Sequence, residues 1–215
     1  MKRISSILTA AVLLVTGSTV FASETGSFGA GVKAGTLGAG VELTYAISPR
    51  FTMGVGINKF SSSTTDTTDG IDYDVDLNLQ TVAVLANFHP FAGSFRITAG
   101  AMINSNELEM TADCSPTCEI GGTDYPEAAV GDLKATVDFN KFAPYAGIGF
   151  GHSASSGLGF TLDVGVLMQG EPQVDISAGP LVSQADIAQE EANAEDDIKG
   201  FTMYPVISAG INFRF

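Results

Sequence analysis

The amino-acid sequence predicts an all-β protein: a closed, antiparallel, eight-stranded transmembrane β-barrel with long extracellular loops and one short loop helix. Two observations predict this fold. Apolar residues alternate with polar or very small residues in many segments, which places the apolar side chains of each strand on one face. In addition, the mean hydropathy is positive, +0.23, although the chain is acidic with a formal net charge of −14.

The first 22 residues have the three parts of a cleavable signal peptide. Lys2 and Arg3 precede an apolar stretch from Ile7 to Val15, and the segment ends with Val20-Phe21-Ala22 before Ser23. The apolar stretch is too short for a spanning helix, so an uncleaved anchor is the weaker alternative. We therefore expect a signal peptide over residues 1–22 and one barrel domain over residues 23–215.

The clearest alternation lies at the end of the chain, where Phe215, Phe213 and Ile211 are separated by Arg214 and Asn212. Similar segments begin near Phe51, Phe95, Phe142 and Leu158 or end near Ile47 and Phe88. Each is about as long as a tilted membrane strand, roughly 9 to 11 residues. In the segments other than the C-terminal one and those that begin near Phe95 and Leu158, the residues expected to face outward are Val41, Leu43, Tyr45, Met53, Val55, Ile57, Leu77, Leu79, Leu85, Ile148 and Phe150.

Short and long connections alternate between these segments. Short turns are expected at 48–50, 92–94 and 154–157, a compact reversal at 34–38, and long loops at 61–76, 107–141 and 170–199. Seven connections give eight strands, with both chain ends on the side of the short turns. A soluble sandwich would also alternate, but its polar faces would not be expected to carry so much glycine and charge.

The acidic residues concentrate on the expected outer side. Of the 24 Asp and Glu residues, only Glu24, Glu42 and Asp163 lie away from the long loops and the strand ends that feed them. A solvated rim explains this without a ligand, whereas a negative mouth would concentrate cations. The candidate solute-binding mouth consists of Asp72, Asp74, Asp76, Asn78 and Gln80, and a plain solvated loop edge is an equally good interpretation.

The expected inward face carries both charge and glycine. A barrel of eight strands is filled by its own side chains, so an open pore is not expected. The alternation predicts a lumen charge network of Lys33, Glu42, Arg96, Asp163 and Arg214. The inward glycines either leave space for water or a small solute, or make room for the Arg side chains and Tyr145.

Two local features are expected in the long loops. Cys114 and Cys118 should form a disulfide in an exported protein. Residues 183–199 should form a helix that begins at Ser183 and Asp186 and lies against the barrel rim. Its Asp196 and Asp197 lie at the negative end of the helix dipole, where a nearby basic group would stabilise them.

Composition and motifs exclude several functions. The negative charge disfavours nucleic acid, two thiols without a nearby histidine disfavour zinc, and we predict no metal and no cofactor. An acyl-transfer enzyme would need an activated Ser or His, but His89 and His152 lie beside short turns and show no acid partner. We therefore predict no enzymatic activity. The expected partners are outer-membrane lipids and, through the C-terminal strand, the barrel-assembly machinery; the barrel itself should be a monomer.

Four segments resemble the CarO family of carbapenem-associated outer-membrane proteins: Lys141–Phe150, Asp72–Asp76, Gly170–Val174 and Glu190–Ala194. The resemblance implies an eight-stranded barrel with structured outer loops, linked to uptake of small amino acids such as ornithine and glycine and to carbapenem susceptibility. The chain departs from the family in ending at Phe215, in lacking Trp and in its pair of cysteines. No family binding residue is carried over.

The functional expectation is an outer-membrane barrel for passive uptake or binding of small polar solutes, including basic or small amino acids. The alternative is a non-conducting barrel with a structural or surface-binding role.

Overall fold

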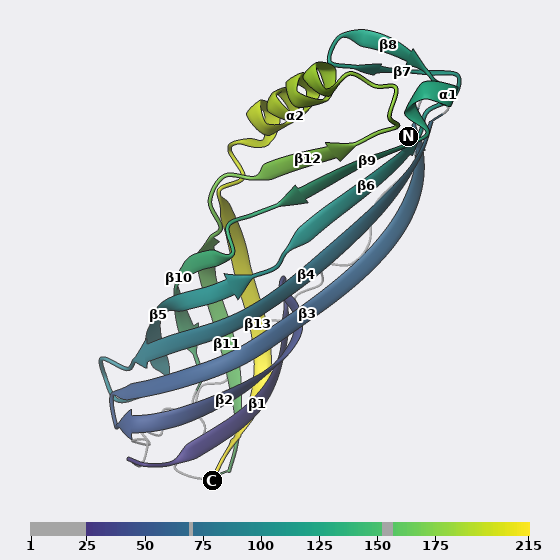
Figure 1. Ribbon diagram of the computed structural model, residues 1–215. Coiled ribbons are helices and arrows are strands. Elements are labelled where there is room, and N and C mark those ends of the chain that lie inside the picture. Colours follow the sequence, from purple (N-terminus) through teal and green to yellow (C-terminus); the bar gives the residue numbers. More distant parts are fainter. Residues whose placement is uncertain (1–24, 69–70, 152–156) are drawn as a thin grey trace.

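The computed structural model describes residues 25–68, 71–151 and 157–215. The expected signal peptide, and most of the turn expected at 154–157, lie outside the described residues. Figure 1 shows a barrel at one end of the molecule and an ordered outer domain at the other.

Eight antiparallel strands close the barrel, as the alternation predicted. Neighbouring strands pair in the order β4, β3, β2, β1, β13, β11, β10 and β5, and pairing of β4 with β5 closes the ring. The strands are β1 (Phe28–Gly35), β2 (Gly38–Ser48), β3 (Phe51–Thr68), β4 (Ile71–Phe88), β5 (Phe95–Asn104), β10 (Phe142–Phe150), β11 (Gly157–Met168) and β13 (Met203–Arg214). Phe28 and Phe215 exchange backbone hydrogen bonds, so the barrel begins and ends beside the short connections.

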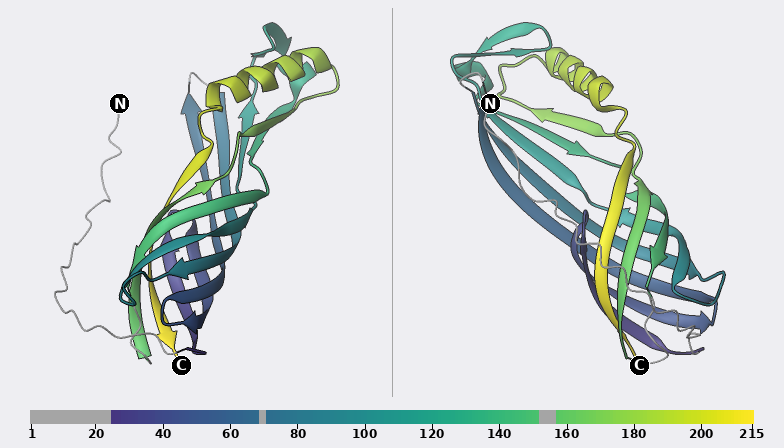
Figure 2. Two further views of the ribbon diagram at one scale, coloured as in Figure 1. Left: turned by 90° about the vertical axis from the view of Figure 1, so that its left-hand side faces the viewer. Right: turned by 180° about the vertical axis from the view of Figure 1, so that it is seen from behind.

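The outer domain is built on the part of β4 that extends beyond the barrel. Beyond the barrel, β4 pairs with β6 (Glu107–Asp113), which pairs with β9 (Asp132–Asp138) and then β12 (Gln173–Ser177). We call the outer half of β4 together with β6, β9 and β12 the extension sheet. Helix α2 (Gln184–Ile198) lies beside it, and the hairpin of β7 (Thr117–Ile120) and β8 (Thr123–Pro126) lies farther out with the short helix α1 (Glu127–Val130) (Figures 1 and 2).

Two of the expected long loops are therefore largely regular structure. The segment 61–76 continues β3 and β4 as a long hairpin, and 107–141 contains β6, β7, β8, α1 and β9. The expectation of a loop at 61–76 rested on its polar composition. However, threonine favours strands, and Val75 and Leu77 alternate with Asp74 and Asp76, so one polar and one apolar face form here too.

An apolar belt surrounds the barrel. Val32, Leu43 and Phe160 are 59%, 60% and 69% exposed, although side chains of this size are normally buried. Aromatic rings gather near the short connections, where the ring centroids of Phe28 and Tyr45 lie 4.9 Å apart. A closed sheet with an outward apolar band and aromatic residues at its edge is built to be surrounded by lipid.

The expected orientation of β4 is wrong. Leu79 and Leu85 are buried, whereas Val82 and Val84 are 43% and 50% exposed, so the odd-numbered residues face inward. Both faces of this strand are apolar between residues 82 and 86, and the alternation there does not identify the outer face. Leu77 has the same orientation as Leu79 because successive side chains point to opposite faces.

The disulfide and the helix expected in the long loops are both present, but the helix lies against the extension sheet and not against the barrel rim. Cys114 and Cys118 form a disulfide, and Cys114 is buried in a cluster with Ile120, Val130 and Ile187. Helix α2 follows Ser183, whose hydroxyl accepts a hydrogen bond from the Ala185 amide. Among the described residues, no helix has both the length and the apolar composition needed to cross a membrane.

Candidate functional site: the lumen and the outer cavity

An apolar layer crosses the barrel interior on the side of the outer domain. Leu37 comes from the β1–β2 turn, and the other members come from inward positions of β4, β5, β10, β11 and β13. Leu167 is completely buried and Met102 is 2% exposed. The layer consists of Leu37, Ala83, Leu85, Met102, Ala143, Tyr145, Leu167 and Val206. Sequence reasoning missed it because the inward face was expected to be polar throughout.

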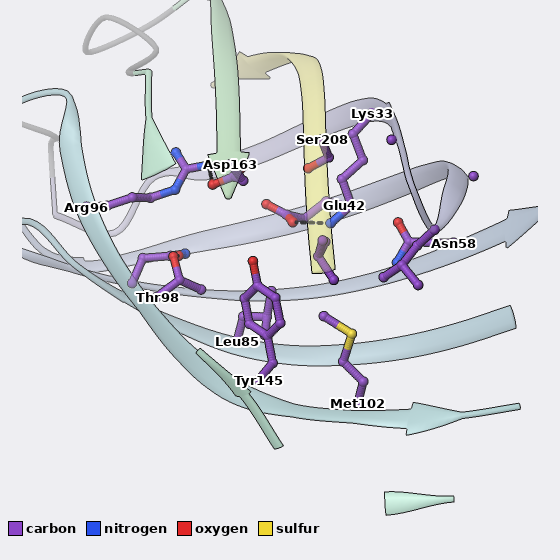
Figure 3. Close-up of a pocket in the computed structure, with 15 residues that line it drawn as sticks. Lys33, Glu42, Asn58, Leu85, Arg96, Thr98, Met102, Tyr145, Asp163 and Ser208 are labelled. Carbon is purple, nitrogen blue, oxygen red and sulfur yellow. Dashed lines mark hydrogen bonds and ion pairs between the residues drawn. The ribbon is translucent and has the colours of Figure 1, made fainter. Parts of the chain in front are cut away.

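Two ion pairs lie beside this layer (Figure 3). Lys33 Nζ lies 3.1 Å from Glu42 Oε2. Arg96 Nη2 donates to both carboxylate oxygens of Asp163 at 2.6 and 2.7 Å, and Arg96 Nη1 donates to the carbonyl of Gly151 at 3.3 Å. These four charged residues of the expected network are brought together inside the barrel, and each finds an opposite charge there.

Arg214 is 7% exposed and lines a second small space, to which Glu42 and Arg96 of these pairs also contribute. Asn212, Thr161 and His89 complete this part of the lining. His89 is itself 7% exposed, at the end of β4 beside the turn to β5. His152 lies outside the described residues.

The inward glycines make room for neighbouring side chains. A Cβ atom on Gly149 would contact Asp163 Oδ1 and would lie 2.6 Å from Arg96 Nε. A Cβ atom on Gly147 would lie 2.8 Å from the Tyr145 hydroxyl, and one on Gly165 would meet the same phenol group. Of the two interpretations of these glycines, the structure therefore favours space for Arg96 and Tyr145 at these positions.

Little space remains in the lumen. One cavity beside the ion pairs and another near Arg214 have volumes of about 30 Å³ each. Each is about a tenth of the roughly 300 Å³ at the lower end of small-molecule sites.

The expected mouth is not assembled as a column leading inward. Asp76, Asn78 and Gln80 have the orientation of Val82 and lie on the outer face of the sheet, as does Asp74. Thr65 Oγ1 donates to Asp74 Oδ1 at 2.6 Å, and the Ser63 hydroxyl donates to Asp76. Asp72 belongs to the same strand, where its backbone pairs with Thr67. The expectation failed because it depended on the wrong orientation of β4.

The extension sheet has a polar outer face and an apolar inner face. Leu77 and Leu79 of β4 face inward, with Leu108 and Met110 of β6, and these side chains line a cavity of about 810 Å³ between the sheet and α2. Asn106 and Gln169, at the outer ends of barrel strands, also line it. This cavity could not be predicted from the sequence, because it depends on how α2 is placed over the sheet.

Carboxylates of α2 cover the edge of the extension sheet. Glu195 Oε1 accepts a hydrogen bond from the Val174 amide at 3.1 Å, and Glu191 Oε1 accepts one from the Ile176 amide at 2.8 Å. These amides belong to β12, the last strand of the extension sheet. An edge strand with free amides is open to pairing with other chains, and α2 protects it here. At the end of the helix, Lys199 Nζ lies 2.5 Å from Asp196, which supplies the expected nearby basic group.

Tyr125 links the β7–β8 hairpin to α2 and should titrate late. Its hydroxyl donates to Asp186 Oδ2 at 2.5 Å, and this hydrogen bond raises the pKa of Tyr125 above the ordinary 10.0, against the opposing effect of the Ser183 amide. A raised pKa means that the contact stabilises the fold below pH 10 and that the stabilisation is lost as the pH rises through the folded-state pKa. The late part of the phenolate absorbance titration should decrease by the amplitude of one tyrosine in Tyr125→Phe. Titration of that group at or below pH 10 would contradict the assignment.

These features define a transmembrane β-barrel of the outer-membrane type: a closed sheet, an apolar belt with aromatic side chains, and chain ends that meet beside the short connections. The chain is similar in fold to the crystal structure of Acinetobacter baumannii CarO2, with 24% identity, a TM-score of 0.61, and coverage of 90% of this chain and 100% of that one. For A. baumannii CarO the identity is 24%, the TM-score 0.57, and the coverage 87% and 97%. The resemblance to CarO barrels is thus confirmed for the fold. No protein-family model and no curated protein matches the chain.

Proposed function

We propose that this protein is an outer-membrane barrel that is closed to free diffusion and acts by binding a small molecule through its outer domain. The observation that carries the proposal is the filled lumen, in which the apolar layer and two ion pairs leave cavities of only about 30 Å³. The large cavity lies in the outer domain instead. The proposal includes no catalytic step and no cofactor.

Passive uptake of small polar solutes, including ornithine or glycine, is the second candidate. One observation favours it: beyond the apolar layer the interior is polar, with Lys33, Glu42, Arg96 and Asp163 lining the remaining space. Separation of the layer residues would connect this polar region to the outer side. In this case the closed conformation would be one of two states, and ligand or voltage would shift the balance between them.

Solute entry into proteoliposomes separates the two candidates. The purified mature protein would be tested with ornithine, glycine and glutamate at low and high salt, with empty liposomes as the blank. We expect no entry above the blank for any of the three. Salt-sensitive entry of ornithine or glycine through the wild-type protein would overturn the proposal and support uptake.

A matched pair of variants shows whether the assay can detect an opened lumen. Leu85→Ser removes an apolar side chain of the layer, whereas Val84→Ser alters the neighbouring lipid-facing position of the same strand. Faster glycine entry in Leu85→Ser than in Val84→Ser would identify the layer as the barrier. Equal entry in the two variants would place the barrier elsewhere.

A further inference from the structure

The cavity of the outer domain is larger than α2 can fill. Ala194 and Ile198 are the apolar residues of the helix that face it, and Ile187 packs instead with the buried disulfide. Opposite them, the extension sheet presents aliphatic side chains such as Leu108, Leu133 and Val137. A volume of about 810 Å³ lies within the range of small-molecule sites, roughly 300 to 1,000 Å³.

The rim of the cavity is acidic. Glu107, Glu119, Glu190 and Asp197 contribute to the lining, and no Lys or Arg is among the described residues that do so. Glu107, Glu119 and Asp197 are exposed, while Glu190 accepts a hydrogen bond from the Gly121 amide at 3.0 Å. Such a rim repels the carboxylate or phosphate of an anionic amphiphile and attracts an ammonium group.

Two buried amide groups in the lining offer further hydrogen bonds. Asn106 and Gln169 are 4% and 3% exposed. Asn106 Oδ1 accepts from the Gln80 amide, and Gln169 Nε2 donates to the Phe201 carbonyl. Among the described residues, Asn106 Nδ2 and Gln169 Oε1 have no partner. An unpaired buried polar atom costs about 1–3 kcal/mol, so a ligand hydroxyl or amide that contacted this pair would gain binding energy.

We propose that this cavity binds an aliphatic cation, a molecule with an alkyl chain between an ammonium group and a second, uncharged polar group. The chain occupies the space between the extension sheet and α2, the ammonium group lies at the acidic rim, and the polar group meets Asn106 and Gln169. This assignment rests on the proposed function, because it names the class of molecule that the outer domain binds.

The absence of Trp from the chain allows a direct binding assay. In lipid vesicles, Phe139→Trp places a single fluorescent reporter in the cavity lining, whereas Phe142→Trp places one on the lipid-facing side, where Phe142 is 66% exposed. The ligands are decylamine, the amino alcohol of the same chain length, and decanoate. A ligand that only dissolves in the lipid changes the second reporter without a saturable change in the first.

We expect saturable binding at Phe139→Trp in the order amino alcohol, decylamine, decanoate, with decanoate weaker than decylamine by a factor of about ten or more. Adding Ala194→Phe should weaken binding by narrowing the cavity beside α2, whereas Ala192→Phe, on the exposed side of α2, should preserve it. Glu119→Gln should weaken decylamine binding by up to about fivefold, the range of an exposed ion pair, and Glu127→Gln should have no effect.

Equal binding of decanoate and decylamine would overturn the cationic ligand class. Binding that is unchanged in Ala194→Phe, or no saturable binding of any of the three, would overturn the site itself. None of these outcomes affects the closed lumen, which solute entry into proteoliposomes measures separately.

Discussion

Replacement of Asp163 by alanine is expected to lower the free energy of unfolding by about 3–5 kcal/mol, because removing one partner of a buried ion pair leaves the other charge unpaired. The side chains of Arg96 and Asp163 are only 12% and 19% exposed. Gly149 lies beside both side chains and has no side chain of its own that could pair with the freed guanidinium group. Urea unfolding in lipid vesicles would measure the change.

A surface pair provides the matched control for this measurement. Lys134 and Glu109 lie 3.2 Å apart with side chains 51% and 35% exposed. Glu109→Ala should therefore change the free energy of unfolding by less than about 1 kcal/mol. The double variant Arg96→Ala with Asp163→Ala should be more stable than the sum of the two single losses implies, since it removes both charges. Additive losses would contradict direct coupling of the two residues.

Truncation of Leu167 to alanine should cost about 2–5 kcal/mol, the range for a large-to-small change that leaves a cavity. Leu167 is completely buried in the apolar layer, where neighbours from β4, β5, β10 and β13 surround it. The barrel wall cannot collapse inward to fill the gap because its circumference is fixed by the closed hydrogen-bond ring. The same urea unfolding measurement in vesicles would detect the loss.

Leu162→Ala is the control for this prediction. Leu162 lies on the same strand but is 53% exposed on the lipid-facing side, where lipid chains can fill the space left by the smaller side chain. It should therefore lose only apolar contact and cost less than Leu167→Ala. If the two variants were equally destabilised, tight packing of the layer would not be a source of stability.

The barrel was predictable because the alternation of side chains along a strand depends only on residues that are close together in the sequence. Phe213, Ile211 and Ala209 of β13 alternate with smaller or polar residues, and strand geometry alone then places them outward. The disulfide and α2 were predictable for the same reason, since Cys114 and Cys118 are close in sequence and Ser183 caps its own helix. These features depend on short stretches of chain.

The site was less predictable because it depends on contacts between distant segments. The orientation of β4 was assigned wrongly where both of its faces are apolar, and the error moved Asn78 and Gln80 to the wrong side. The outer cavity needs Leu77, Leu108 and Ile198, which come from three elements far apart in the chain. Asn106 and Gln169 stand out only through their burial, which the sequence does not show.

Strand β4 belongs both to the barrel and to the extension sheet. Thr81–Phe88 pairs with β5 and closes the barrel, while Tyr73–Asn78 pairs with β6 in the extension sheet, and β3 accompanies both halves. A slip of one residue along β4 would turn Leu85 out of the apolar layer and, at the same time, Leu77 out of the outer cavity. The barrel and the outer domain therefore cannot change register independently. Correct pairing of β4 with β5 in the barrel also places the apolar side chains of β4 correctly in the outer cavity.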